Sequence, residues 1–172
     1  MIDIYYGDES GVNLEPNVPY GWQFGDEEVS MPSAKGKGIN CFGLFTRDNK
    51  SWAATSEEAI KADFVVEQLE RFSFSLKKLT VVVLDNAPIH TGKAMTERVE
   101  YWQQRGLFIF YLPTYSPHLN IAETVWRKLK YEWLAPTDYE DRERLRYSVK
   151  QALKEFGRSL KINFSNFKHS LT

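Results

Sequence analysis

Three acidic side chains stand at predicted ends of secondary-structure elements and together could bind metal ions. Asp8 follows an apolar, β-prone run over residues 2–6, and Asp85 follows a β-branched run over residues 78–84. Glu123 lies in the first turn of a predicted helix. If the two strands are neighbours in one sheet, Asp8 and Asp85 converge, and Glu123 approaches from the covering helix. Carboxylates suit Mg²⁺, and two ions about 4 Å apart can activate an attacking oxygen and stabilise a leaving oxygen in phosphoryl transfer.

Each of the three residues also has a purely local explanation. Asp is favoured in turns, so Asp8 and Asp85 are equally explained as residues that end a strand. Asn120 and Glu123 have the N-cap and N3 spacing of a capping box, so Glu123 is also explained as part of a helix cap. Taken singly, the three positions leave both interpretations open.

Polar neighbours of these carboxylates are candidates for supporting roles. Glu9 and Asn86 follow Asp8 and Asp85 directly, so we predict that they donate or accept hydrogen bonds that orient the metal ligands. His90 is a candidate for contact with a phosphate or with the bond that is cut. The alternatives are solvated turn residues for the first two and a packing or capping role for His90.

Four basic residues are candidates for contact with DNA phosphates. Arg127 and Lys130 follow Glu123 by four and seven residues, so they share its side of the predicted helix. An ion pair between Glu123 and Arg127 explains the same spacing. Lys35 and Lys37 lie in a glycine-flanked turn, where they are candidate contacts to the DNA backbone or simply solvated lysines.

The order of predicted elements indicates an α/β fold. An antiparallel meander comes first and is followed by alternating helices and strands, which predicts a mixed five-stranded sheet with helices on both faces, the layout of an RNase H-like domain. The predicted strands cover 2–6, 27–31, 39–45, a short candidate at 51–54, 78–84 and 107–112. The predicted helices cover 56–74, 92–104, 121–133 and 137–156, the first and last opened by capping boxes at 55–58 and 137–140.

Length and composition limit the classes of protein that the chain can represent. Its 172 residues are the usual size of one compact domain, so we expect residues 1–172 to form a single one. The longest apolar run is too short to cross a membrane, and a lone cysteine, Cys41, excludes an internal disulfide or a cysteine zinc site. The net charge of -1 is unlike that of a dedicated nucleic-acid module, so any DNA contact must be local.

Three blocks of the sequence resemble the catalytic blocks of transposases. They are Gly7–Ser10, Val81–His90 and Tyr111–Trp126, in that order. Over about residues 2–156 the chain is similar to DDE transposases of the mariner superfamily, particularly its bacterial insertion-sequence branch. The resemblance implies that Asp8, Asp85 and Glu123 bind the metal ions. The chain departs from the family pattern at Ile121, where a proline is usual, and in a slightly longer gap before Glu123.

The resemblance also implies an activity and its partners. We expect cleavage at transposon ends followed by attack of the freed 3′ hydroxyl on target DNA, with two Mg²⁺ ions per site and Mn²⁺ as a substitute. We further expect a homodimer in the active complex, a cytoplasmic, nucleoid-associated location, and the absence of the N-terminal helix-turn-helix region, so that activity alone is weak or lost. Two alternatives stay open: an RNase H-like nuclease without strand transfer, and an inactive DNA-binding remnant.

Overall fold

A mixed sheet forms the centre of the computed structural model, which describes residues 2–15, 38–114 and 116–165. Within those residues the sheet has five strands in the order β3-β2-β1-β4-β5. β1, β2 and β3 pair antiparallel, whereas β4 and β5 run parallel to β1. The predicted mixed five-stranded sheet is confirmed. The strands are β1 (Asp3–Val12), β2 (Ile39–Phe45), β3 (Ser51–Ser56), β4 (Thr80–Leu84) and β5 (Leu107–Tyr111). The strand predicted at 27–31, with Lys35 and Lys37, lies outside the described residues.

The first strand is longer than the sequence predicts, because it has two partners of different length. β4 pairs with β1 only as far as Tyr6, which lies opposite Val83. β2 continues the pairing on the other edge of β1 as far as Val12. Asp8 therefore lies inside a strand, just beyond the end of the parallel pairing, and the prediction that it ends a strand is wrong. The condition under which Asp8 and Asp85 converge is met, because β1 and β4 are neighbours in the sheet.

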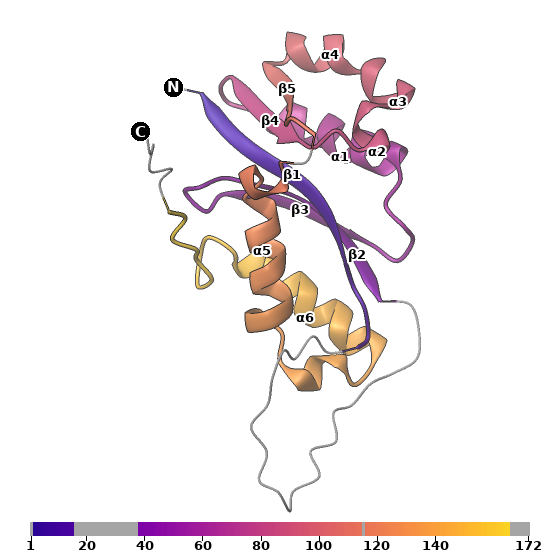
Figure 1. The fold of residues 1–172 in the computed structure, drawn as a ribbon, viewed down its shortest axis with the longest axis vertical. Helices are drawn as coiled ribbons and strands as arrows, with labels where there is room; N and C mark the ends of the chain where they lie inside the picture. Colours follow the sequence, from indigo (N-terminus) through magenta and orange to yellow (C-terminus); the bar gives the residue numbers. More distant parts are fainter. Residues whose placement is uncertain (1, 16–37, 115, 166–172) are drawn as a thin grey trace, which may run out of the picture.

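Helices cover both faces of the sheet, as predicted. Figure 1 shows α1 to α4 grouped around β4 and β5, and α5 and α6 together on β1 and β2. β2 divides the core by alternation, with Phe42 and Leu44 packed on the α1 side and Cys41 and Phe45 on the α5–α6 side. The helices are α1 (Ala62–Ser75), α2 (Pro88–Thr91), α3 (Lys93–Thr96), α4 (Val99–Gln104), α5 (Ala122–Lys128) and α6 (Arg142–Glu155), and the short helical turns are η1 (Pro117–Leu119), η2 (Leu129–Trp133) and η3 (Pro136–Tyr139).

Both predicted capping boxes are wrong, because other contacts use their residues. Thr55 and Ser56 pair with β2, so α1 begins only at Ala62. The first three residues of the second box lie in η3, which ends at Tyr139. α6 is capped instead by Asp141, whose side chain accepts a hydrogen bond of 2.8 Å from the backbone of Arg144. In each case a local pattern is overridden by the neighbouring structure.

Two predicted helices are interrupted in the structure. The helix predicted over 92–104 is divided into α3 and α4, and it is preceded by α2, which ends at an extended Gly92. The helix predicted over 121–133 changes at Leu129 into the π-helical turn η2, in which the backbone of Leu134 donates to Leu129. Among the described residues, no helix combines the length and hydropathy that a membrane crossing needs.

A partly buried ionic hub around Glu70 joins α1 to α4. Its carboxylate accepts hydrogen bonds from Arg98, Arg105 and the indole of Trp102, the last at 2.9 Å. Partial burial of Glu70 opposes its ionisation, but these donors outweigh the effect and lower the pKa of Glu70 to about 2. The hub fixes the layer of helices that covers β4 and β5, and no pattern in the sequence marks it.

We expect Glu70→Gln to destabilise the protein by about 1–2 kcal/mol at pH 7, because the variant loses the charge that both arginines bind. The folded-state pKa is depressed, so this contribution is present above pH 4.5 and fades as the pH falls towards 2. Urea unfolding of both proteins at pH 7 and at stepwise lower pH tests this. An equal difference at pH 7 and pH 2.5 would contradict a charge-based role.

Candidate active site

The three carboxylates singled out from the sequence line one pocket of about 220 Å³. The β1–β4 register, with Tyr6 opposite Val83, brings Asp8 level with Asp85 two residues further on. Glu123 reaches the same pocket from the first turn of α5. Asp8 is partly buried, whereas Asp85 and Glu123 are exposed. The pocket therefore has one carboxylate at its floor and two at its rim.

A buried asparagine holds α5 against β1 beside this pocket. The amide nitrogen of Asn120 donates to the backbone oxygen of Gly7 at 2.9 Å, and its amide oxygen accepts from the backbone nitrogen of Ala122 at 3.0 Å. Gly7 precedes Asp8, and Glu123 follows Asn120 by three residues. One side chain thus sets the position of Glu123 relative to Asp8. It is itself only 5% exposed.

The sequence indicates only a turn or capping role for Asn120 and does not reveal this contact. The capping half is present, since Asn120 accepts from Ala122. Glu123 does not complete a capping box, because within the described residues its side chain makes no hydrogen bond. The available signal was the position of Asn120 in the third motif block, but nothing local identifies Gly7 as its partner.

His90 is buried between two carboxylates and is shielded from solvent. Its Nδ1 lies 2.6 Å from Oδ1 of Asp85, and its Nε2 lies 3.1 Å from Oε2 of Glu9, although the second contact is not aligned as a hydrogen bond. Burial opposes protonation of His90, but the carboxylates of Glu9 and Asp85 outweigh it and raise its pKa. With its side chain 0% exposed, His90 does not reach a phosphate in this arrangement, contrary to one prediction, and instead braces Glu9 and Asp85.

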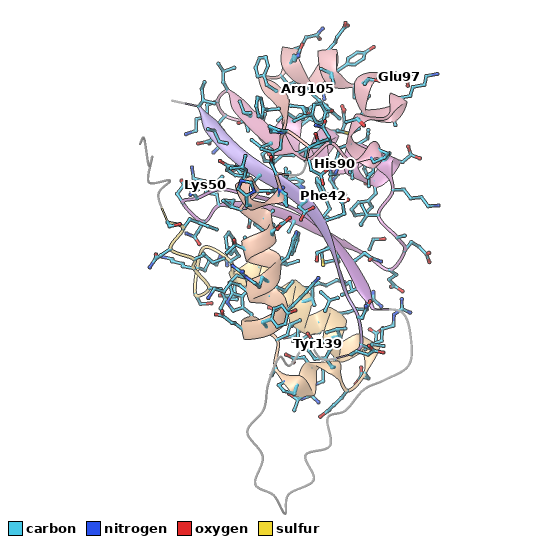
Figure 2. The ribbon with its side chains drawn as sticks, viewed as in Figure 1. Phe42, Lys50, His90, Glu97, Arg105 and Tyr139 are labelled. Atoms are coloured by element: carbon cyan, nitrogen blue, oxygen red, sulfur yellow. The ribbon has the colours of Figure 1, made fainter. Side chains whose placement is uncertain are left out.

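The loop after β4 is fixed by its own hydrogen bonds. Asn86 donates to the backbone oxygen of Leu112 at 2.7 Å, and Tyr111 donates to the backbone oxygen of His90 at 2.8 Å. Asn86 therefore ties this loop to the end of β5. Its predicted role, a hydrogen bond that orients an acidic ligand, is not among its contacts within the described residues. Figure 2 shows His90 in α2, the short helix that this loop enters.

Asp8 carries the clearest electrostatic perturbation of the three acids. Burial, together with the nearby charges of Glu9, Asp85 and Glu123, raises the pKa of Asp8 to about 7. Negative charge is thus concentrated in the pocket, and a bound cation would relieve it.

The donor set fits a divalent cation, although it is not assembled around one. Within the described residues, no three acidic, cysteine or histidine side chains are gathered as a ready metal centre. Both contacts of Asp85, from Ala87 and His90, end on its Oδ1, which leaves Oδ2 for a ligand. Oxygen donors of this kind match Mg²⁺ or Mn²⁺ rather than zinc.

A second, larger groove of about 710 Å³ runs from the acids along α5. Asp8 and Glu123 line one end, and Arg127 and Lys130 line it further along the helix, as the spacing predicts. The alternative ion pair between Glu123 and Arg127 is absent from the described residues. The groove therefore joins acidic metal-ligand candidates to basic side chains that form no ion pair within the residues that the structure describes.

The chain matches the family model described as DDE superfamily endonuclease over residues 3–146. That range includes Asp8, Asp85 and Glu123. No curated protein matches the chain.

Solved structures share the fold at low sequence identity. The catalytic core domain of BIV integrase is 14% identical with a TM-score of 0.58, over 92% of this chain and 86% of that one. A Mos1 transposase paired-end complex with left transposon end is 16% identical with a TM-score of 0.54, over 88% of this chain and 52% of that one. A simian T-cell lymphotropic virus intasome in complex with PP2A regulatory subunit B56 gamma is 12% identical with a TM-score of 0.59, over 89% of this chain and 47% of that one. The chain spans about half the length of the last two, and the RNase H-like fold is confirmed.

We expect Asn120→Ala to destabilise the protein by about 2 kcal/mol, because it removes two buried hydrogen bonds and leaves the Gly7 carbonyl without its partner. Urea unfolding measures the loss. Asn40→Ala is the matched control, since Asn40 makes one exposed hydrogen bond to Glu58 and its loss should cost less than about 0.5 kcal/mol. Equal losses in the two variants would contradict the role given to Asn120.

We expect Asp8→Asn to stabilise the metal-free protein at pH 8 by about 1–2 kcal/mol, or about 2–8 °C in Tm, because the variant buries no charge. The folded-state pKa of Asp8 is raised, so the wild type loses this stability as the pH rises from 3.8 through about 7. Thermal unfolding with a chelator at pH 4 and pH 8 tests the difference. Exposed Asp63→Asn should give no such gain, and a gain for Asp8→Asn that is as large at pH 4 would contradict the explanation.

Proposed function

The chain belongs to the DDE superfamily endonucleases, and we propose that it is a transposase catalytic domain that cuts and joins DNA strands at Asp8, Asp85 and Glu123. The observation that carries the proposal is that these three acids, from three separate sequence blocks, line one pocket. The mixed sheet that brings them together has the fold of transposase and integrase catalytic cores.

We propose that Asp8, Asp85 and Glu123 hold divalent cations, Mg²⁺ with Mn²⁺ as a substitute. Two such ions supply activation of an attacking oxygen and stabilisation of a leaving oxygen at phosphorus. Asp85 offers its free Oδ2, while its Oδ1 stays bound to His90 and the Ala87 backbone. His90 is a positioning residue, because it orients Asp85 and Glu9 without itself reaching the pocket surface.

In this proposal the groove along α5 receives the DNA strand. Arg127 and Lys130 bind phosphates beside the position that is cut, because they line the same groove as Asp8 and Glu123. Asn120 keeps α5 in register with β1, so the basic side chains and the acids stay at a fixed spacing. The positive end of the groove offsets the negative pocket as a phosphate approaches.

The proposed substrates are transposon ends and a target duplex, handled in turn by one site. Strand cleavage by water and joining by a 3′ hydroxyl are both in-line displacements at phosphorus, so neither needs a covalent bond to the protein. We further propose that the active complex is a homodimer on the DNA of the nucleoid, with end recognition supplied by a separate DNA-binding region.

We expect Asp85→Asn to lower metal-dependent nicking of supercoiled plasmid by at least about 100-fold, because the variant loses an anionic metal ligand. Gel assays with Mn²⁺ and with Mg²⁺ measure it. Exposed Glu97→Gln is the control and should nick like the wild type. Unchanged nicking by Asp85→Asn would refute the assignment of the site.

The same assay separates joining from simple cleavage. A labelled oligonucleotide with a free 3′ hydroxyl should become covalently attached to the plasmid if the domain transfers strands. Nicking without any attachment would favour a nuclease that does not join.

A further inference from the structure

Another groove is lined by cations, and none of its described lining residues belongs to the pocket of the three acids or to the groove along α5. It has a volume of about 560 Å³ and lies between β3 and the end of α6. Among the described residues that line it, four are basic and none is acidic: Lys50, Lys150, Lys154 and Arg158. In a chain with a net charge of -1, such a concentration of one sign is a local feature that composition does not reveal.

Three of these cations have no acidic partner among the residues that the structure describes. Lys150 and Lys154 lie one turn apart on α6, and Arg158 comes three residues after its last residue, Glu155. All three are exposed, and none forms an ion pair within the described residues. Lys50 differs, because it pairs with Asp3 and Asp48 at 3.6 and 3.2 Å. Figure 2 shows Lys50 near the turn that joins β2 to β3.

The first half of α6 shows that the unpaired charges are not a general property of this helix. There, Arg142 pairs with Glu57, and Arg144 pairs with Glu140. Arg146 pairs with both Glu57 and Glu143. A cation near a helix end also interacts favourably with the helix dipole, which explains Lys154 but not the whole set. The end of α6 therefore differs from its beginning, because its basic side chains have no acidic partners among the described residues.

The opposite wall of the groove is small and polar. β3 is an edge strand, and Ser51, Ala53 and Thr55 lie opposite Phe45, Gly43 and Cys41 of β2, on the face that α6 covers. Short side chains leave room for a bulky ligand, and the two hydroxyls can donate to oxygen atoms. A row of long cations facing small hydroxyl residues matches a sugar–phosphate backbone.

We propose that this groove, bounded by β3 and by Lys150, Lys154 and Arg158, binds the phosphate backbone of duplex DNA without regard to sequence. The inference rests on the proposed function and adds a second contact region to it. Cations that contact phosphates position a duplex but do not read its bases, so the partner that fits is the target duplex rather than a specific transposon end.

The test compares two variants that lose the same net charge. One carries Lys150→Gln, Lys154→Gln and Arg158→Gln, and the control carries Arg71→Gln, Lys77→Gln and Lys93→Gln on the exposed α1–α3 side. Fluorescence anisotropy with a duplex of random sequence gives the affinity at several NaCl concentrations. We expect the groove variant to bind at least about 10-fold more weakly at low salt. The slope of the logarithm of its affinity against the logarithm of the salt concentration should be shallower by about 2–3. The affinity of the control should stay within about 2-fold of that of the wild type.

Equal weakening in both variants, or wild-type affinity in the groove variant, overturns the proposal, as does a wild-type chain that binds no DNA. Thermal unfolding of each variant confirms that it is folded. Plasmid nicking by the same proteins keeps the two claims apart. A wild type that binds through the groove but never nicks, with either metal, would refute the proposed activity and leave the groove assignment standing.

Discussion

The hydrogen bond between Asn120 and the backbone of Gly7 is the constraint on which the candidate site depends. It joins segments 113 residues apart in the sequence and is buried, so it is protected from competition with water. Because Asp8 and Glu123 are close in sequence to its two ends, a shift of α5 by even part of a turn would separate them. The register between β1 and β4 fixes the position of Asp8 relative to Asp85. Together the two constraints place the three acids in one pocket.

The sequence predicts those parts of the protein that depend on local pattern or on ordered motifs. The run before Asp85 is recognisable as a buried strand because it is apolar without alternation, and the three motif blocks identify the acids. The capping pattern at Thr55 failed because pairing with β2 is worth more than a cap. The contacts of Asn120 and Glu70 escaped prediction for another reason: each joins elements whose proximity is fixed only by the folded sheet.

Charge in this protein is separated in space rather than in sequence. The acids gather at the carboxyl end of β4, where burial and mutual repulsion raise the pKa of Asp8. The buried imidazole of His90 lies between two of these carboxylates, those of Glu9 and Asp85. Basic side chains that form no ion pair within the described part of the chain lie along α5 and η2 and at the end of α6. A nearly neutral total is therefore compatible with strong local fields of both signs, which is what a protein that handles cations and polyanions requires.

The division of the core into two hydrophobic clusters has a dynamic consequence. Val82 and Leu84, which lead to Asp85, belong to one cluster, whereas Val125 and Trp126, which follow Glu123, belong to the other. Clusters of this kind often open as separate cooperative units, whose free energies of opening are lower than that of global unfolding. Transient detachment of the α5–α6 layer would remove Glu123 while β1 and β4 stayed paired. Amide hydrogen exchange along α5 would thus track the fraction of time for which the three acids are together.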